Sequence, residues 1–362
     1  MARLGDYVRI RTGKLDANAS SENGQYPFFT CAVEPLKIDS YSYDCECVLV
    51  AGNGDLNVKY YNGKFDAYQR TYIIESLDKA VLSVPYLYCF LDKYVETLRQ
   101  QAIGGVIKYI KLGNLTEADI PIPSIAEQEN TVANINKANE LISLRKEQLA
   151  KLDELVKSRF IELFGDPNLN DKGWLMGVIN DIGTCVAGAT PSTQVKEYWE
   201  NGTIPWMSSG EVNKGRVFET DTRITQLGYD NASTKLVPPK TVVLAMAGQG
   251  RTRGTAAITE IELCTNQSIC SIVNNKKVHS EYLLYFLKLQ YIELRGASTN
   301  TDGRGGLNLK IIGNYPIMIP PKELQEQFAA FVEQTDKSKL AIQQSLDKLE
   351  LLKKSLMQKY FG

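Results

Sequence analysis

The chain has 362 residues, of which 43% are apolar and 23% charged, and its formal net charge is −1. This balance is ordinary for a soluble globular protein, and at about 100–200 residues per domain the length predicts two to three folded units. The near-zero charge gives no bulk sign of nucleic-acid binding, so any polyanion site must come from a local arrangement or from a partner.

The sequence also excludes several classes of protein. Its N-terminus, MARLGDYVRIRTG, has no apolar stretch long enough for a signal peptide, and no apolar run approaches the ~20 residues that a membrane span needs. We therefore expect a cytoplasmic protein that makes no membrane contact. The seven cysteines are odd in number and include no Cys-x-x-Cys pair, which favours free thiols over a disulfide framework or a metal site.

Residues 1–120 predict a mixed α/β module. The stretch CVLVAGNGDLNVKYYNGKFDAY (47–68) predicts a strand, a glycine loop and a hairpin that turns at Asn62-Gly63, because this pair tolerates the positive φ of a type I′ turn. The stretch VPYLYCFLDKYVETLRQQ (84–101) predicts an amphipathic helix, and the glycine-rich loop AIGGVIKY (102–109) follows it.

A long helix is predicted next, over about 126–163. It follows the proline-bearing IPIPS (120–124) and opens with the acidic turn AEQE, which suits the positive end of a helix. A seven-residue repeat predicts a coiled-coil seam, interrupted at Arg145 and Arg159. Its members are Ile135, Ile142, Leu149, Val156 and Leu163, with Ala138 and Leu152 between them. The stretch FGDP (164–167) indicates a helix end with a glycine cap and a proline stop.

The second half of the chain repeats the first in the same order. YPFFTC (26–31) matches IPWMSS (204–209), CVLVAGNG (47–54) matches VVLAMAGQG (242–250), YLYCFL (86–91) matches YLLYFL (282–287), and IPIP (120–123) matches IMIP (317–320). SEYLLYFLKLQYIELRG (280–296) predicts an amphipathic helix, followed by the glycine-rich TNTDGRGGLN. A second long helix is predicted over about 323–360, with Ile342, Leu346, Leu349 and Leu356 on its seam and an interruption at Lys353.

The helical ends carry the clearest repeat. KLDELVKSRFIELFG (151–165) and KLELLKKSLMQKYFG (348–362) are identical at seven of fifteen positions. The repeat predicts modules over 1–120 and 166–318, each followed by a helical segment over 121–165 or 319–362. A lone amphipathic helix has no core of its own, so we expect the two helices to pack together, antiparallel because a large module separates them. The pattern alone leaves parallel packing open.

No motif predicts catalysis. GQGRTRG (248–254) follows a strand, but its third glycine is misplaced for a dinucleotide or S-adenosylmethionine loop, and TAAITEIELC after it predicts another strand. His279 begins a predicted helix and is the only histidine, which favours a capping role over a general base. A chain of this length without an acid–base constellation favours a binding protein with no cofactor, metal or catalytic residue of its own.

The repeat resembles a known family. Each long helix is entered through proline and Glu-Gln (Glu127-Gln128 and Glu326-Gln327) and ends in Phe-Gly, and GATPST (188–193) and IPWMSSGEV (204–212) open the second module. In these features the chain resembles the specificity subunit of type I restriction–modification systems. The first module departs from the pattern, because it has GKLDAN (13–18) and no clear Thr-Pro-Ser element.

The resemblance implies an α+β fold in which two mixed α/β target-recognition domains are joined by two long helices that form an antiparallel coiled coil with a pseudo-twofold repeat. Each domain would recognise half of a split, asymmetric sequence in double-stranded DNA. The helices would dock two adenine-N6 methyltransferase subunits, which bind S-adenosylmethionine, and through them the restriction subunits with nuclease and translocase activity. The specificity subunit would itself be non-catalytic.

Loop residues able to contact base edges or phosphates are the predicted DNA-binding set. In the first module they are Thr30, Asn53, Asp55, Asn57, Lys59, Arg70 and Lys108, and in the second Ser208, Ser209, Gln249, Arg251, Arg253 and Arg304. For any single position, a solvated surface side chain is the competing interpretation. Three other functions stay open on sequence alone: a scaffold whose modules bind proteins, a self-sufficient enzyme with cryptic sites, and a related system that methylates without restriction.

Overall fold

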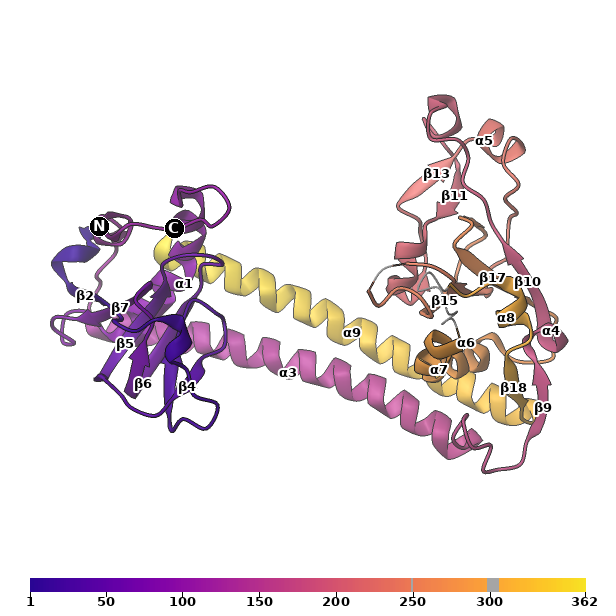
Figure 1. Cartoon of the computed structure of the whole chain (residues 1–362), viewed down its shortest axis with the longest axis horizontal. Helices are drawn as coiled ribbons and strands as arrows, with labels where there is room; N and C mark the ends of the chain where they lie inside the picture. The colour runs from indigo at the N-terminus through magenta and orange to yellow at the C-terminus, as the bar shows by residue number, and fades with distance from the viewer. Residues whose placement is uncertain (249, 298–305) are drawn as a thin grey trace. The chain divides into compact units, whose positions relative to one another are not determined.

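A computed structural model describes residues 1–248, 250–297 and 306–362 (Figure 1). The chain divides into two compact units. Unit 1 consists of Met1–Glu147 and Gln343–Gly362, and unit 2 of Gln148–Ile342. The unit boundary divides both long helices, α3 (Ile125–Phe164) and α9 (Lys322–Phe361). These bounds confirm the two long helices to within one residue at each end.

Unit 1 is built on a six-stranded sheet in the order β2-β7-β5-β6-β3-β4. Its strands are β2 (Val8–Thr12), β3 (Tyr26–Phe29), β4 (Leu36–Ile38), β5 (Tyr43–Ala51), β6 (Val58–Ala67) and β7 (Thr71–Ser76). β1 (Ala2–Arg3) pairs with β8 (Asp119–Ile120) in a separate two-stranded sheet, and α2 spans Leu112–Thr116. β5 is central because Cys47–Ala51 are buried without alternation, as in a strand covered on both faces.

Helix α1 (Val84–Gln101) has the predicted bounds. Ser83 caps it by accepting a hydrogen bond from the Tyr86 N–H. The predicted hairpin turn at Asn62-Gly63 is wrong, however. β6 continues through both residues, and Gly63 pairs with Cys45 of β5 at a φ of 138°. The chain reverses earlier, in the glycine loop after β5, because eight residue pairs between β5 and β6 outweigh the local turn preference of Asn-Gly.

Unit 2 repeats this plan, but its strands form a five-stranded and a three-stranded sheet. One has the order β10-β17-β14-β15-β12 and the other β13-β11-β16, while β18 pairs with β9. The strands are β9 (Leu175–Val178), β10 (Gly183–Ala187), β11 (Ile204–Met207), β12 (Arg216–Val217), β13 (Thr222–Ile224), β14 (Val242–Ala245), β15 (Ala256–Thr259), β16 (Cys264–Thr265), β17 (Ile269–Asn274) and β18 (Pro316–Ile319). The short helices are α4 (Ile179–Ile182), α5 (Gln226–Asp230) and α8 (Leu309–Gly313). β3 and β11, whose sequences match, each have one antiparallel and one parallel neighbour.

The single helix predicted over 280–296 is instead two helices, α6 (Ser280–Leu289) and α7 (Tyr291–Ala297). The break falls at Gln290, which is 4% exposed. Its side-chain amide donates to Asn168 Oδ1 at 2.9 Å and accepts from the Tyr315 hydroxyl at 2.6 Å. These partners are distant in sequence, so local helical periodicity could not reveal the break.

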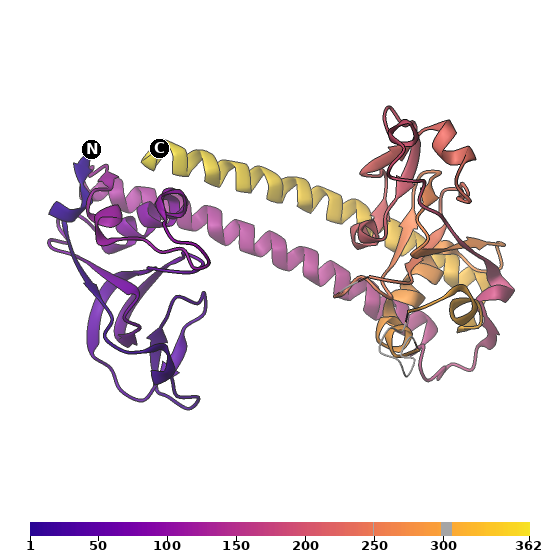
Figure 2. The same cartoon turned by 45° about the horizontal axis from the view of Figure 1, so that its top comes forward.

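Within each unit, α3 and α9 are antiparallel. In unit 1, Asn134 Nδ2 donates to the Tyr360 hydroxyl at 3.1 Å and Lys146 pairs with Glu350 at 3.1 Å, and Figures 1 and 2 both show these helix segments side by side. In unit 2, Lys339 pairs with Asp153 at 2.6 Å. All ten predicted seam residues are buried or half-buried. They are Ile135, Ile142, Leu149, Leu152, Val156, Leu163, Ile342, Leu346, Leu349 and Leu356.

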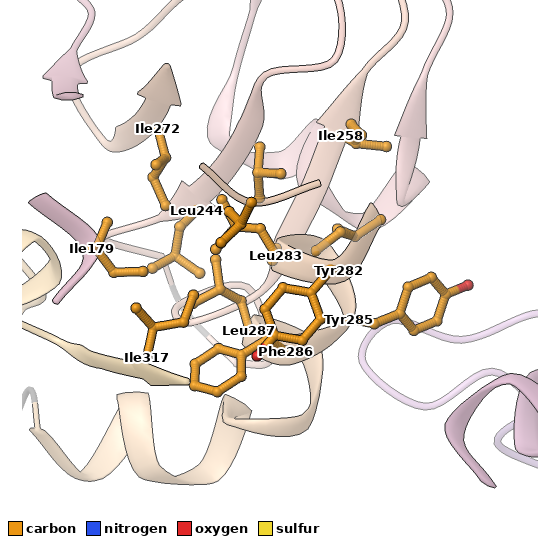
Figure 3. Close-up of a cluster of buried hydrophobic side chains, with 14 of the residues drawn as sticks. Ile179, Leu244, Ile258, Ile272, Tyr282, Leu283, Tyr285, Phe286, Leu287 and Ile317 are labelled. Atoms are coloured by element: carbon orange, nitrogen blue, oxygen red, sulfur yellow. The ribbon is translucent and has the colours of Figure 1, made fainter. Parts of the chain in front are cut away.

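The end of each long helix completes a hydrophobic core. Phe164, the last residue of α3, is fully buried in unit 2 with its ring 4.8 Å from that of Tyr282 (Figure 3 shows the surrounding cluster). Phe361, the last residue of α9, has the matching place in unit 1, 5.2 Å from Tyr86. Gly165 follows with a φ of 79°, which confirms the predicted glycine cap. The Phe-Gly repeat is therefore structural.

A buried glutamine marks the start of each long helix. Gln128 Oε1 accepts from the Ser83 N–H at 2.9 Å, and Gln325 Oε1 accepts from the His279 N–H at 2.6 Å, so both glutamines close the start of a core helix. The predicted match of Gln128 with Gln327 is wrong, since Gln327 is exposed. The sequence offset here is 197, as in the Phe-Gly repeat, and not 199.

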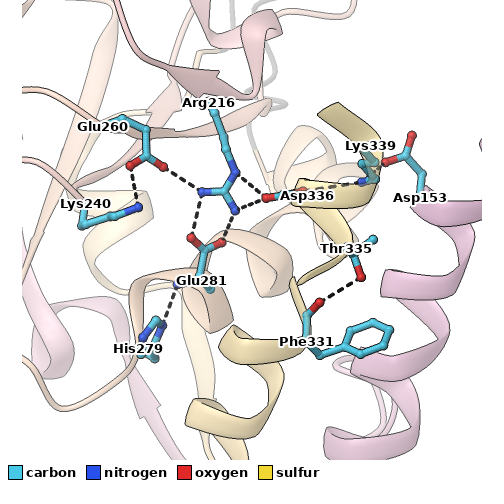
Figure 4. A network of polar contacts seen from close by, with 10 residues as sticks. All are labelled: Asp153, Arg216, Lys240, Glu260, His279, Glu281, Phe331, Thr335, Asp336 and Lys339. Atoms are coloured by element: carbon cyan, nitrogen blue, oxygen red, sulfur yellow. Dashed lines mark hydrogen bonds and ion pairs between the residues drawn. The ribbon is translucent and has the colours of Figure 1, made fainter. Parts of the chain in front are cut away.

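One ionic network in unit 2 joins the sheet to α9. The Arg216 guanidinium contacts Glu281 at 2.7 Å, Glu260 at 2.8 Å and Asp336 of α9 at 2.8 Å (Figure 4). Burial alone would lower the pKa of Arg216, but its carboxylate partners raise it, so the charge stays in place. The network fixes the position of β12 against α9 in this unit.

Candidate nucleic-acid interface

In unit 1 a loop cluster forms at the end of the sheet where β5 passes into β6. The loop over 52–57 reverses the chain, with Gly54 at a φ of 71°. Backbone hydrogen bonds join it to the loop after α1: the Gly54 N–H donates to Lys108 O at 2.9 Å, and the Ile110 N–H donates to Gly52 O at 3.0 Å. Two glycine-rich segments that lie far apart in sequence therefore meet at one end of the sheet.

Two further segments join this cluster. The Gly52 N–H donates to Arg70 O at 2.8 Å, and Asn57 Nδ2 donates to Cys31 O at 2.8 Å. The structure therefore brings the predicted residues of the first module together at this end of the sheet. They are Thr30, Asn53, Asp55, Asn57, Lys59, Arg70 and Lys108. Whether they contact DNA stays a prediction.

These residues differ in their exposure to solvent and in the hydrogen bonds that they already make. Arg70 and Lys108 are exposed. The half-buried Lys59 has a lowered pKa because burial disfavours its charge. Thr30 is only 8% exposed, and its hydroxyl accepts a hydrogen bond from the Ala32 N–H at 3.2 Å, so its position supports a role in shaping the turn. The Asn57 amide is likewise engaged by backbone carbonyls within the cluster.

Unit 2 places its glycine loop in the equivalent position. The loop follows β14 and leads into β15, and the Leu307 N–H donates to Met246 O at 3.1 Å, as Ile110 does to Gly52 in unit 1. Arg251 is exposed and Arg253 half-buried. The predicted residues Gln249 and Arg304 lie outside the described residues.

The predicted serines of unit 2 begin a short 3-10 helix over Ser209–Lys214. The Ser208 hydroxyl donates to Glu211 Oε2 at 3.1 Å. Glu211, only 4% exposed, also accepts from the Lys214 ammonium at 3.0 Å and from the Asp221 N–H at 2.9 Å. Ser208 therefore has a structural partner, and both serines are half-buried.

Sequence reasoning missed one matched pair of arginines. Arg99, near the end of α1, donates to Leu56 O at 2.7 Å and lies 3.7 Å from Asp55. Arg295, near the end of α7, donates to Gly250 O at 2.7 Å and Arg253 O at 3.2 Å. Each arginine therefore holds the glycine loop of its own unit. The signal was present, because Leu98-Arg99 and Leu294-Arg295 have the same offset as the YLYCFL and YLLYFL match.

The strands predicted after the two glycine loops are present as β6 and β15. Each loop leads from one strand into the next, whereas a dinucleotide loop opens a helix whose N–H groups face a phosphate. His279 is the N-cap of α6, since its Nδ1 accepts from the Glu281 N–H at 3.2 Å, which confirms the capping role. Among the described residues no group of three or more His, Cys, Asp or Glu side chains could hold a metal ion. Within the same ranges, no helix is both long and apolar enough to cross a membrane.

Comparison with known families decides the family. The model of the type I restriction modification DNA specificity domain matches residues 1–154 and again residues 171–352. The chain belongs to this family. Its two matched regions correspond to the two halves of the internal repeat.

Curated relatives carry the same description. The chain is 37% identical to the type I restriction enzyme EcoDI specificity subunit of Escherichia coli over 42% of this chain and 34% of the relative. It is 23% identical to the EcoR124I/EcoR124II specificity subunit of Escherichia coli over 73% of this chain and 66% of the relative. The chain thus spans between one third and two thirds of the length of these relatives.

A solved structure shares the fold across the full chain. The type I restriction–modification S subunit from M. genitalium superimposes with a TM-score of 0.65 at 16% identity, covering 100% of this chain and 95% of that one. A chain from a structure of a type I restriction–modification complex gives a TM-score of 0.61 at 16% identity over 99% and 96%. The type I specificity fold, with two mixed α/β domains and antiparallel long helices, is therefore the fold of this chain.

Proposed function

We propose that this chain is the DNA-recognising specificity subunit of a type I restriction–modification complex, and that units 1 and 2 each bind one half of a split, asymmetric target. The observation that carries the proposal is the loop cluster built twice on one plan with different chemistry. Unit 1 offers Asn53 and Asp55 where unit 2 offers Arg251 and Arg253. Arginine favours guanine and asparagine favours adenine in the major groove, so the two half-sites should differ.

The charge of the chain fits a subunit that works with partners. Neutralising DNA phosphates takes lysine and arginine, yet the net charge here is −1. The proposal therefore places most backbone contacts on the two adenine-N6 methyltransferase subunits, which also bind S-adenosylmethionine. This chain has no catalytic role in the proposal, and restriction depends on nuclease and translocase subunits recruited through the methyltransferases.

The repeated helix ends support docking of the same partner twice. The fold accounts for Leu152 and Leu349 on the seam and for the buried phenylalanines. It does not account for Leu155 and Leu352, which are identical in the repeat yet 48% and 49% exposed. The identical lysine and serine two and three residues further on, Lys157-Ser158 and Lys354-Ser355, are exposed as well. Two copies of one exposed surface are what two copies of one partner require.

Stoichiometry tests the docking proposal. We expect L155D and L352D each to reduce the bound methyltransferase from two copies to one, and the double variant to bind none, as measured by native mass spectrometry of the complex. Leu340, 61% exposed on α9 with Ser143 at its matched place, provides the control, and L340D should keep two copies. Two bound copies in the double variant would remove this part of the proposal.

Helix length supports a rule for the target. α3 and α9 each have 40 residues, about 60 Å at 1.5 Å per residue, against about 34 Å for one turn of B-DNA. We propose that the helices set the gap between half-sites. Deleting matched whole turns from both helices should shorten the non-specific spacer and leave both half-sites unchanged. An unchanged spacer would refute the rule, and failure to bind any duplex with the methyltransferase present would favour a protein-binding scaffold.

A further inference from the structure

The loop after α1 ends in an apolar tip, defined as Val106 and Ile107. Val106 is 104% exposed, the highest value for a large apolar side chain among the described residues, and Ile107 is 62% exposed. Two adjacent β-branched side chains at the tip of a loop leave apolar surface in water, which is unfavourable by roughly 25 cal/mol per Å². Packing within unit 1 does not explain why these two positions carry apolar side chains.

The tip is held in a defined position. Ile103 and Tyr109 exchange two backbone hydrogen bonds, of 3.0 and 2.9 Å, across its base. Gly104 has a φ of 117°, and a Cβ at this position would lie 2.5 Å from Ile107 O. Tyr109 also pairs with Asn53 of the glycine loop. The apolar tip is therefore presented beside the predicted DNA-binding residues and not on a free segment.

The charge around the tip favours a polyanionic occupant. Residues 1–120 contain more acidic than basic residues. At this end of the sheet the order is reversed: the exposed basic side chains Arg70, Lys108 and Lys111 outnumber the acidic ones. The acidic side chains are Asp55, which already lies 3.7 Å from Arg99, and Glu34, whose charge acts on Lys59. A protein partner with an apolar surface would not by itself require this cationic border, whereas duplex DNA offers phosphates around apolar base surfaces.

We propose that the apolar tip contacts the bases of the half-site recognised by unit 1, so that Val106 and Ile107 are specificity-determining residues. This inference rests on the proposed function. Apolar side chains recognise DNA by contact with the thymine methyl group or by wedging between base steps, and both contacts bury a Val or Ile side chain without neutralising a phosphate. The contact therefore adds sequence preference and no salt dependence.

The test uses the complex with its methyltransferase subunits and the target duplex. V106S/I107S should assemble as wild type, bind the target about tenfold or more weakly, and lose discrimination against a scrambled unit 1 half-site while keeping it for the other half-site. The slope of log affinity against log salt should not change, whereas K108A/K111A should reduce it. L77S is the matched control: Leu77 is also 62% exposed but follows β7 at the end opposite Arg70, and its affinity should match wild type.

Three results separate the explanations. Wild-type affinity and discrimination in V106S/I107S would overturn the inference. Loss of complex assembly in that variant would also overturn it, by showing that the tip docks a protein. If instead the wild-type complex shows no sequence preference on any duplex, the proposed function itself fails.

Discussion

The buried glutamine at the start of α3 gives a prediction whose size follows from three hydrogen bonds. Gln128 is 0% exposed; it accepts from the Ser83 N–H at 2.9 Å and donates to Val81 O at 2.7 Å and Pro123 O at 2.9 Å. Q128L preserves side-chain size but removes all three bonds. Each buried backbone group left without a partner costs about 1–3 kcal/mol.

Partial hydration reduces the total. Val81 is exposed, and Ser83 and Pro123 are half-buried, so water can reach part of the vacated site. We therefore expect Q128L to lower the free energy of unfolding of unit 1 by about 2–4 kcal/mol. Each kcal/mol lost should lower the Tm of a unit of this size by about 2–4 °C. Urea unfolding followed by unit-specific probes measures the loss, and hydrogen exchange should show the Ser83 amide losing protection.

The repeat provides a matched set for this experiment. Q325L should destabilise unit 2 by a similar mechanism, because Gln325 accepts from His279 N–H and donates to Pro320 O at 2.8 Å. Q327L should have an effect within about 0.5 kcal/mol, since Gln327 is exposed. A Q128L chain as stable as Q327L, with Ser83 still protected, would refute the reasoning.

Three further predictions concern the cores and their charges. F164A should destabilise unit 2 by about 3–5 kcal/mol and F361A should destabilise unit 1 by less, because Phe164 is fully buried and Phe361 is 9% exposed; calorimetry of each variant resolves the order. R216M should lower the free energy of unfolding by about 3–5 kcal/mol, because the buried Glu281 loses the Arg216 guanidinium as its partner. R216M/E281Q should recover part of that loss, as measured by urea unfolding. Burial lowers the pKa of His279, so the folded state favours the neutral imidazole. The stability that this group contributes is therefore fully present above its ordinary pKa of 6.5 and is lost as the pH falls below that value. H279N keeps an N-cap acceptor that does not titrate, and its unfolding free energy should vary less than that of wild type between pH 6.5 and 5; an unchanged pH dependence would contradict the assignment.

The features that the sequence predicts well are those set by local periodicity and caps. The seam from Ile135 to Leu163 follows from a seven-residue repeat, and α1 follows from Ser83, Pro85 and an apolar face. The glycine loops were also predictable, because an apolar run before Gly-x-Gly marks a strand and its end. The same pattern pointed to the predicted DNA-binding residues of unit 1, because they lie in or beside loops that meet at one end of the sheet.

The features that the sequence did not predict depend on distant partners. Asn62-Gly63 stays within β6 because β5 and β6 form eight residue pairs that include both residues. Gln290 ends a helix where Asn168 and Tyr315 bind its side-chain amide. The matched positions of Arg99 and Arg295 could be found from the repeat, but their hydrogen bonds to backbone carbonyls of the glycine loops could not. Thr30, Asn57 and Ser208 have polar side chains suited to DNA, but only the folded structure shows that neighbouring groups already engage them.

The most direct test of the central claim is methylation-sensitive sequencing of DNA from cells with and without this gene, with the neighbouring methyltransferase gene intact. The account predicts that N6-methyladenine disappears from one split, asymmetric motif when the gene is removed, and that the motif's two halves and spacer are thereby defined. A methylome that is the same with and without the gene, in cells where the complex is expressed and assembled, would contradict the claim that this chain selects the DNA target.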